Sequence, residues 1–145
     1  MKQLFNIFLV AFLFAITSCN TQRLLLKVND AKKLETNKGD FIGKPLKNVL
    51  SEIKPKIKFV YGIPENTSAE AIGGTYFTFY FVDKEDGKKR INVNDIPTQI
   101  TIRFKLEKLN NRKPLPKEGL TKWTEKETKE YGDMIIQNIY VSGEN

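Results

Sequence analysis

Strict alternation of apolar and polar residues is the feature that most constrains how this chain can fold. From Tyr76 to Phe81, phenylalanine fills every second position, with tyrosine or threonine between. From Ile100 to Leu106, apolar residues alternate with Thr101 and charged residues. Successive side chains of a β-strand point to opposite faces, so a period of two predicts strands with one buried face and one solvated face. These two segments therefore predict a sheet that is covered on one side.

Two other segments have the pattern of helices. Four apolar residues spaced i, i+3, i+4 and i+7 form a stripe that follows Pro45 and ends before Pro55: Leu46, Val49, Leu50 and Ile53. Thr124 and Glu127 form a capping box, which predicts a short helix to about Tyr131, with Gly132 at its end.

The remaining elements complete an α+β pattern. Ile57, Phe59 and Tyr61 alternate with Lys56, Lys58 and Val60, which predicts a strand with the first set buried. Asp86-Gly87 predicts a turn within 83–89, followed by a short return strand over 90–93, and 134–141 reads as a final strand. The expected fold is a small antiparallel sheet of about four strands with two helices packed on one face. Its core would join the phenylalanines and the Ile100 series to Leu46, Val49 and Leu50.

The N-terminus has the features of an export signal. Lys2 precedes an apolar run from Leu4 to Ala15, and Ile16-Thr17-Ser18-Cys19 follows it. The run is too short for a membrane-spanning helix, which needs about 20 residues. This ending resembles the lipobox of bacterial lipoproteins. The resemblance implies that Cys19 is acylated and becomes the new N-terminus, so that lipid alone holds the protein on a membrane.

The resemblance also divides the chain and suggests a location. Residues 1–18 are the expected signal peptide, 19–39 a lipid-anchored tether with a short helix between Asp30 and Asn37, and 40–145 a single α+β domain. By resemblance to lipoprotein sorting signals, Asn20 in place of an aspartate favours the outer membrane. No acidic cluster follows Cys19, which favours the side that faces the periplasm.

Composition limits the chemistry. The chain has no histidine and only the one cysteine, which excludes Ser-His-Asp and Cys-His catalysis, histidine-ligated zinc and a histidine pH switch. We assign no catalytic residue, no metal and no cofactor. The net charge of +7 would draw the chain to anionic surfaces, but the lysines are scattered, which is typical of plain solubility.

One candidate binding face follows from the strand pattern. If the phenylalanines point inward, Tyr76 and Tyr80 point outward, and neighbouring strands add cations to the same face: Lys56, Lys58, Arg103 and Lys105. Aromatic rings and cations together could stack sugar rings or contact phosphates. The alternative is the ordinary solvated side of a two-sided sheet.

The sequence therefore predicts a lipid-anchored cell-envelope protein with a non-enzymatic binding or accessory role. Its partner would be another envelope protein or an anionic envelope polymer, and the export signal argues against nucleic acid. One alternative is a carboxylate-dependent polysaccharide hydrolase, which needs two carboxylates about 5–10 Å apart in a cleft. Another is an inhibitor or immunity protein against an exported toxin, which predicts a protruding loop or an exposed apolar patch.

Overall fold

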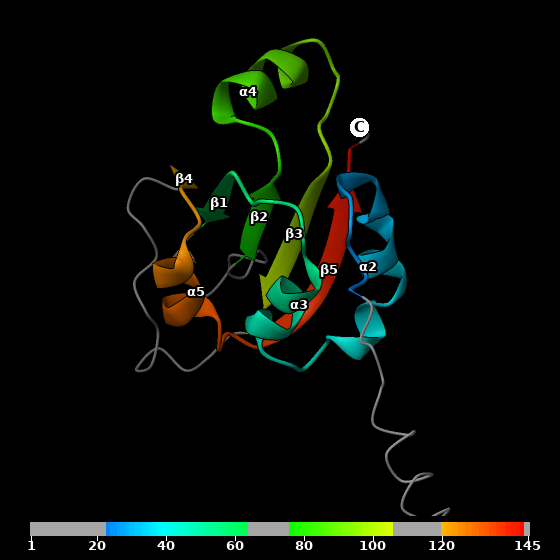
Figure 1. Cartoon of the computed structure of the whole chain (residues 1–145), viewed down its shortest axis with the longest axis vertical. Coiled ribbons are helices and arrows are strands. Elements are labelled where there is room, and N and C mark those ends of the chain that lie inside the picture. Colours follow the sequence, from blue (N-terminus) through cyan, green and yellow to red (C-terminus); the bar gives the residue numbers. More distant parts are fainter. Residues whose placement is uncertain (1–22, 64–75, 106–119, 144–145) are drawn as a thin grey trace, which may run out of the picture.

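Four antiparallel strands form the centre of the molecule. A computed structural model describes residues 23–63, 76–105 and 120–143. The strands are β1 (Phe59–Ile63), β2 (Tyr76–Tyr80), β3 (Gln99–Phe104) and β5 (Ile136–Ser142), and the two-residue β4 (Leu120–Thr121) pairs with β1. The sheet order is β4-β1-β2-β3-β5 (Figure 1). The expected α+β class with an antiparallel sheet is confirmed.

Short helices precede the first strand or connect later ones. They are α2 (Lys32–Thr36), α3 (Leu46–Glu52), α4 (Lys84–Asn92) and α5 (Glu125–Tyr131). Single 3-10 turns occupy Val28–Asp30 (η1) and Lys38–Asp40 (η2). Among the residues that the structure describes, no helix is both long and apolar enough to cross a membrane.

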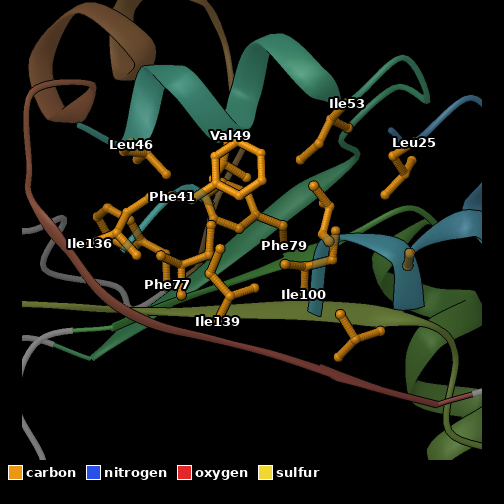
Figure 2. Packing of buried hydrophobic residues seen from close by; sticks show 14 of the residues in the cluster. Leu25, Phe41, Leu46, Val49, Ile53, Phe77, Phe79, Ile100, Ile136 and Ile139 are labelled. Atoms are coloured by element: carbon orange, nitrogen blue, oxygen red, sulfur yellow. The ribbon is translucent and has the colours of Figure 1, made fainter. Parts of the chain in front are cut away.

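The core lies between the inner face of the sheet and α3. Leu46 and Val49 of α3 point toward Phe79 and other sheet residues, and both are fully buried (Figure 2). Phe77 is the centre of an aromatic cluster, in which its ring contacts four others edge to face: Phe79, Phe104, Trp123 and Tyr131. The phases predicted for the strands over 76–81 and 100–106 are confirmed up to Phe104, because the phenylalanines and isoleucines are buried, and Leu106 lies outside the described residues.

Backbone bonds between α3 and the turn after α5 fix the two helices. Pro45 is the N-cap of α3 and has an extended backbone. The first N–H groups of a helix have no partner within it. Here those of Leu46 and Lys47 donate to the carbonyl oxygens of Met134 and Gly132, at 2.9 and 2.8 Å. The capping box of α5 is present as predicted, with Thr124 and Glu127 capping each other.

The phase predicted for the first strand is wrong. Val60 and Gly62 face the core, whereas Tyr61 is exposed and Phe59 stacks on Tyr80 on the opposite face. Gly62 explains why this side of β1 faces the core, because a Cβ atom at this position would lie 2.9 Å from the Phe77 ring. The bare backbone at this position makes room for a large inner-face aromatic side chain.

The turn and return strand predicted over 83–93 are also wrong, because this segment is helix α4. Its charges suit a helix: Glu85 and Asp86 lie in the first turn and Lys89 and Arg90 in the last, where each sign complements the helix dipole. Gly87 is tolerated within the helix because it is buried. A Cβ atom added there would contact the side chains of Val82 and Phe59.

The packed part of the chain begins before the boundary predicted at residue 40. Leu25 and Leu34 are fully buried in the core. The N–H of Leu25 donates to the Glu52 carbonyl, and the Leu25 carbonyl accepts from Lys54. The helix predicted between Asp30 and Asn37 is present as α2, and it covers the outer edge of β5, where Lys32 and Glu35 bond the backbone of Val141. This segment is part of the domain and not only a tether.

Candidate binding face of the sheet

The face of the sheet opposite the core is rich in tyrosine, threonine and amide side chains. We call it the outer face and define it by the alternate positions of the four long strands, excluding Ile63: Phe59, Tyr61, Tyr76, Thr78, Tyr80, Gln99, Thr101, Arg103, Asn138, Tyr140 and Ser142. None of these positions holds a carboxylate. The face therefore offers ring surfaces, hydrogen-bonding groups and positive charge.

One end of the outer face is built by an aromatic stack. The rings of Phe59 and Tyr80 lie nearly parallel, 11° apart, with centroids separated by 4.4 Å. The register places these residues opposite each other on β1 and β2. Gly87 of α4 lies close to the Phe59 ring, because a Cβ atom added to this glycine would be 3.8 Å from the ring's Cζ atom. Helix α4 thus borders this end of the face.

The centre of the face combines hydroxyl groups with phenols. Thr78 and Thr101 share a hydrogen bond of 3.0 Å between their hydroxyl groups, and Thr78 is only 6% exposed. Burial raises the pKa of the Tyr76 and Tyr80 phenols above the usual value, and the neighbouring phenol of Tyr61 raises each pKa further. The phenols of Tyr76 and Tyr80 therefore stay protonated at neutral pH.

The far end of the face is positively charged. The guanidinium of Arg103 and the ammonium of Lys38 each lie 5.8 Å from the ring centroid of Tyr140. Tyr140 is 40% exposed, and its phenol oxygen accepts a hydrogen bond of 2.9 Å from the Asn138 amide. Asn138 lies directly opposite Arg103 in the sheet. Lys38 comes from η2, far away in the sequence.

The structure brings together only part of the predicted site. Tyr76, Tyr80 and Arg103 lie on the outer face, with Tyr76 and Arg103 paired in register. Lys58 forms an ion pair with Asp83 at 3.1 Å. Lys56 is exposed before β1 begins, and Lys105 is exposed beyond the end of β3. The face is thus more aromatic and less basic than the sequence predicted.

The sequence reasoning missed Phe59, Tyr61, Tyr140 and Lys38 as members of this site. The first two were assigned to the core because the phase of β1 was inverted. Tyr140 could have been found, since it alternates with Ile139 and Val141, which are buried. Lys38 carried no signal, because only the folded chain places η2 beside β5.

A pocket of about 430 Å³ lies elsewhere, beside the start of the described chain. Its lining includes the two carboxylates of Asp40 and Glu52. Glu52 is already engaged, because its Oε2 accepts a hydrogen bond of 3.0 Å from the Leu24 N–H. Within 23–63, 76–105 and 120–143, no group of three or more acidic, cysteine or histidine side chains could hold a metal ion.

No family model, curated protein or solved structure matches this chain. The expected signal peptide and Cys19 lie outside the described residues. We therefore infer the function from the geometry of the described residues together with the lipobox-like sequence.

Proposed function

We propose that the protein is a lipid-anchored cell-envelope protein that binds a saccharide chain on the outer face of its sheet and catalyses no reaction. The observation that carries the proposal is a carboxylate-free sheet face with five aromatic side chains: Phe59, Tyr61, Tyr76, Tyr80 and Tyr140. Sugar rings present C–H groups that pack on aromatic rings, and hydroxyl groups that bond to phenols, threonines and amides. The face supplies each of these groups.

The arrangement of the helices supports the proposal. Leu46 and Val49 of α3 and Tyr131 of α5 belong to the same core cluster as the inner-face phenylalanines. We propose that both helices pack on that one face of the sheet. The outer face would then be open to a long, unbranched ligand, which a flat surface accommodates better than an enclosed cavity does.

The anchor forms the other half of the proposal. Acylation of Cys19 would hold the domain at the outer membrane, facing the periplasm, where envelope saccharides are within reach. Changing Cys19 to Ala should abolish acylation and leave an unprocessed or soluble form. Membrane fractionation at high salt, with mass spectrometry of the wild-type N-terminus, tests this. Persistent membrane association of the variant, together with an unacylated wild type, would contradict it.

Saccharide binding is tested with variants of the exposed rings. Changing Tyr61 and Tyr140 together to Ala should weaken binding to envelope polysaccharide about tenfold or more, because each stacked ring contributes on the order of 1 kcal/mol. The matched control changes Ile91 and Val93, which are exposed apolar residues of the α4 segment, to Ala. Isothermal titration calorimetry gives the comparison. Equal affinity in all three proteins would contradict a binding role for the outer face.

Binding fits the geometry better than hydrolysis does. The described pocket holds two carboxylates, but the backbone bond to Leu24 engages one of them. A retaining or inverting hydrolase needs both to face the bond that breaks. The variant with Asp40→Asn and Glu52→Gln should therefore behave like the wild type when reducing ends released from envelope polysaccharide are measured.

A second candidate function is favoured by α4. The helix projects beyond the end of the sheet (Figure 1), and the segment after its middle exposes three apolar side chains: Ile91, Val93 and Ile96. An inhibitor or immunity protein presents such a projection to its target. If this is the function, Ile91→Asp with Val93→Asp should abolish protection against the exported toxin, whereas the Tyr61 and Tyr140 variant should protect fully.

A further inference from the structure

Two cations share one ring at the Tyr140 end of the outer face. Arg103 of β3 and Lys38 of η2 are both 5.8 Å from the centroid of Tyr140. In the described part of the chain, neither forms an ion pair with a carboxylate. Several other basic side chains do: Lys32, Lys33, Lys47, Lys58, Lys88 and Arg90.

Among the described residues, no carboxylate is paired with the two cations at this end. The alternate positions that make up the outer face carry no carboxylate. Asp40, in the same turn as Lys38, lines the separate pocket beside Leu24. Glu35, on the neighbouring α2, accepts bonds from Lys32 and the Val141 backbone. A cation over a ring at an exposed site gains only about 0.5–1 kcal/mol, so an anion close to these cations adds attraction that the ring does not supply.

Arg103 and Lys38 can bind an anionic group in complementary ways. Arginine presents a planar fork that bonds two oxygens of a carboxylate or a phosphate at once, while lysine acts as a compact point charge. The hydrogen bond from Asn138 orients Tyr140, which is 40% exposed. A sugar ring that contacts the exposed part of Tyr140 would thus place an attached acidic group near Arg103 and Lys38.

We infer that Lys38, Tyr140 and Arg103 form an anion subsite, so that the saccharide bound by the outer face is an acidic one that carries carboxylate or phosphate groups. This inference rests on the proposed function and specifies its ligand class. The other end of the face, built by Phe59 and Tyr80, supplies rings without charge and takes the neutral part of the chain.

The test uses the full lipidated protein in detergent micelles and two matched pairs of probes. One pair is an oligogalacturonate and the same oligomer after carboxyl reduction. The other is phosphorylated dextran and unmodified dextran. The wild type should bind at least one acidic probe about tenfold more tightly than its neutral counterpart, because charge-assisted hydrogen bonds are the stronger kind. The acidic arm that shows the preference identifies the anionic group as a carboxylate or a phosphate.

Variants separate the subsite from general charge. Lys38→Gln with Arg103→Gln should abolish the preference and its salt dependence, while neutral probes bind as before. Lys89→Gln with Lys126→Gln removes the same charge from surfaces away from Tyr140, and it should keep the preference. Arg103→Lys retains the charge but loses the fork, and it should keep only part of the preference. Thermal melting establishes that each variant folds.

The outcomes distinguish this inference from the proposed function. A wild type that binds acidic and neutral probes equally, or a Lys38 and Arg103 double variant that keeps its preference, overturns the anion subsite and leaves saccharide binding standing. A wild type that binds none of the four probes, with Tyr61 and Tyr140 variants unchanged toward envelope polysaccharide, overturns both.

Discussion

The two faces of the sheet are built from alternate residues of the same strands, yet their aromatic side chains are arranged differently. On the inner face, Phe77 meets neighbouring rings edge to face from several directions, at centroid distances of 5.3 to 6.2 Å. On the outer face, Phe59 and Tyr80 stack nearly parallel. Edge-to-face clusters enclose each ring, whereas a stack on a sheet leaves ring surface accessible. Aromatic content alone therefore does not distinguish core from binding surface.

Polar groups make the second difference between the faces. Apart from Gly62, the paired inner-face positions of the four long strands hold only valine, isoleucine and phenylalanine, so truncation there removes only packing. The outer face pairs the hydroxyl groups of Thr78 and Thr101 and carries phenols beside a guanidinium. We expect inner-face changes to alter the free energy of unfolding strongly, and outer-face changes to alter it less. Four stability measurements examine that division, from the largest expected effect to the smallest.

Truncation of the core should be the most damaging change. Phe79→Ala or Ile102→Ala should each lower the free energy of unfolding by about 2–5 kcal/mol, because both side chains are fully buried and each leaves a cavity. Urea unfolding measures the loss. Tyr61→Ala is the matched control on the outer face and should change stability much less. A melting temperature unmoved by both core changes would refute the assigned strand phases.

Adding a side chain at Gly62, beside Phe77, should lower the free energy of unfolding by a smaller amount. Gly62→Val places a Cβ 2.9 Å from a ring that several neighbours already hold, so overpacking should lower the free energy of unfolding by about 1–3 kcal/mol. Gly39→Ala is the control, since no atom lies within 4 Å of its Cβ position. Unfolding in urea compares them. Equal stability of the two variants would mean that β1 does not place Gly62 against Phe77.

The threonine pair allows a double-mutant cycle on the outer face. Thr78→Val or Thr101→Val alone should cost about 1 kcal/mol, because one buried hydroxyl loses its partner, whereas the double change should be nearly neutral. The four unfolding free energies give the coupling between the two residues. Additive single changes would show that the two hydroxyl groups do not bond to each other in solution.

The smallest effect is a pH dependence of stability at alkaline pH. Burial raises the pKa of Tyr80 in the folded state, so the unfolded chain ionises first. The stabilisation is therefore complete below the ordinary tyrosine pKa of about 10 and is lost as pH rises through the raised value. Tyr80→Phe should flatten that decline. Urea unfolding at a series of alkaline pH values tests this, and parallel wild-type and variant curves would contradict it.

Local periodicity explains which elements could be predicted. The strands over 76–81 and 100–104, the stripe of α3 and the capping box of α5 each depend on neighbours within about one or two turns or pleats. For α4, local cues conflicted. Asp86-Gly87 reads as a turn, while the charges of the segment suit a helix, and packing of Gly87 against Phe59 settled the outcome.

The sequence by itself determined the α+β pattern and the outward direction of Tyr76, Tyr80 and Arg103. Only the tertiary structure decided the phase of β1. Its larger side chains, Phe59 and Tyr61, lie on the outer face, while Val60 and Gly62 face the core, and this arrangement depends on Phe77 across the strand pair. The tertiary structure also decided which residues meet at the far end of the outer face. Lys38 and Arg103 meet at Tyr140 because α2 and η2 are placed beside β5, and no local pattern encodes a contact between segments so far apart in the chain.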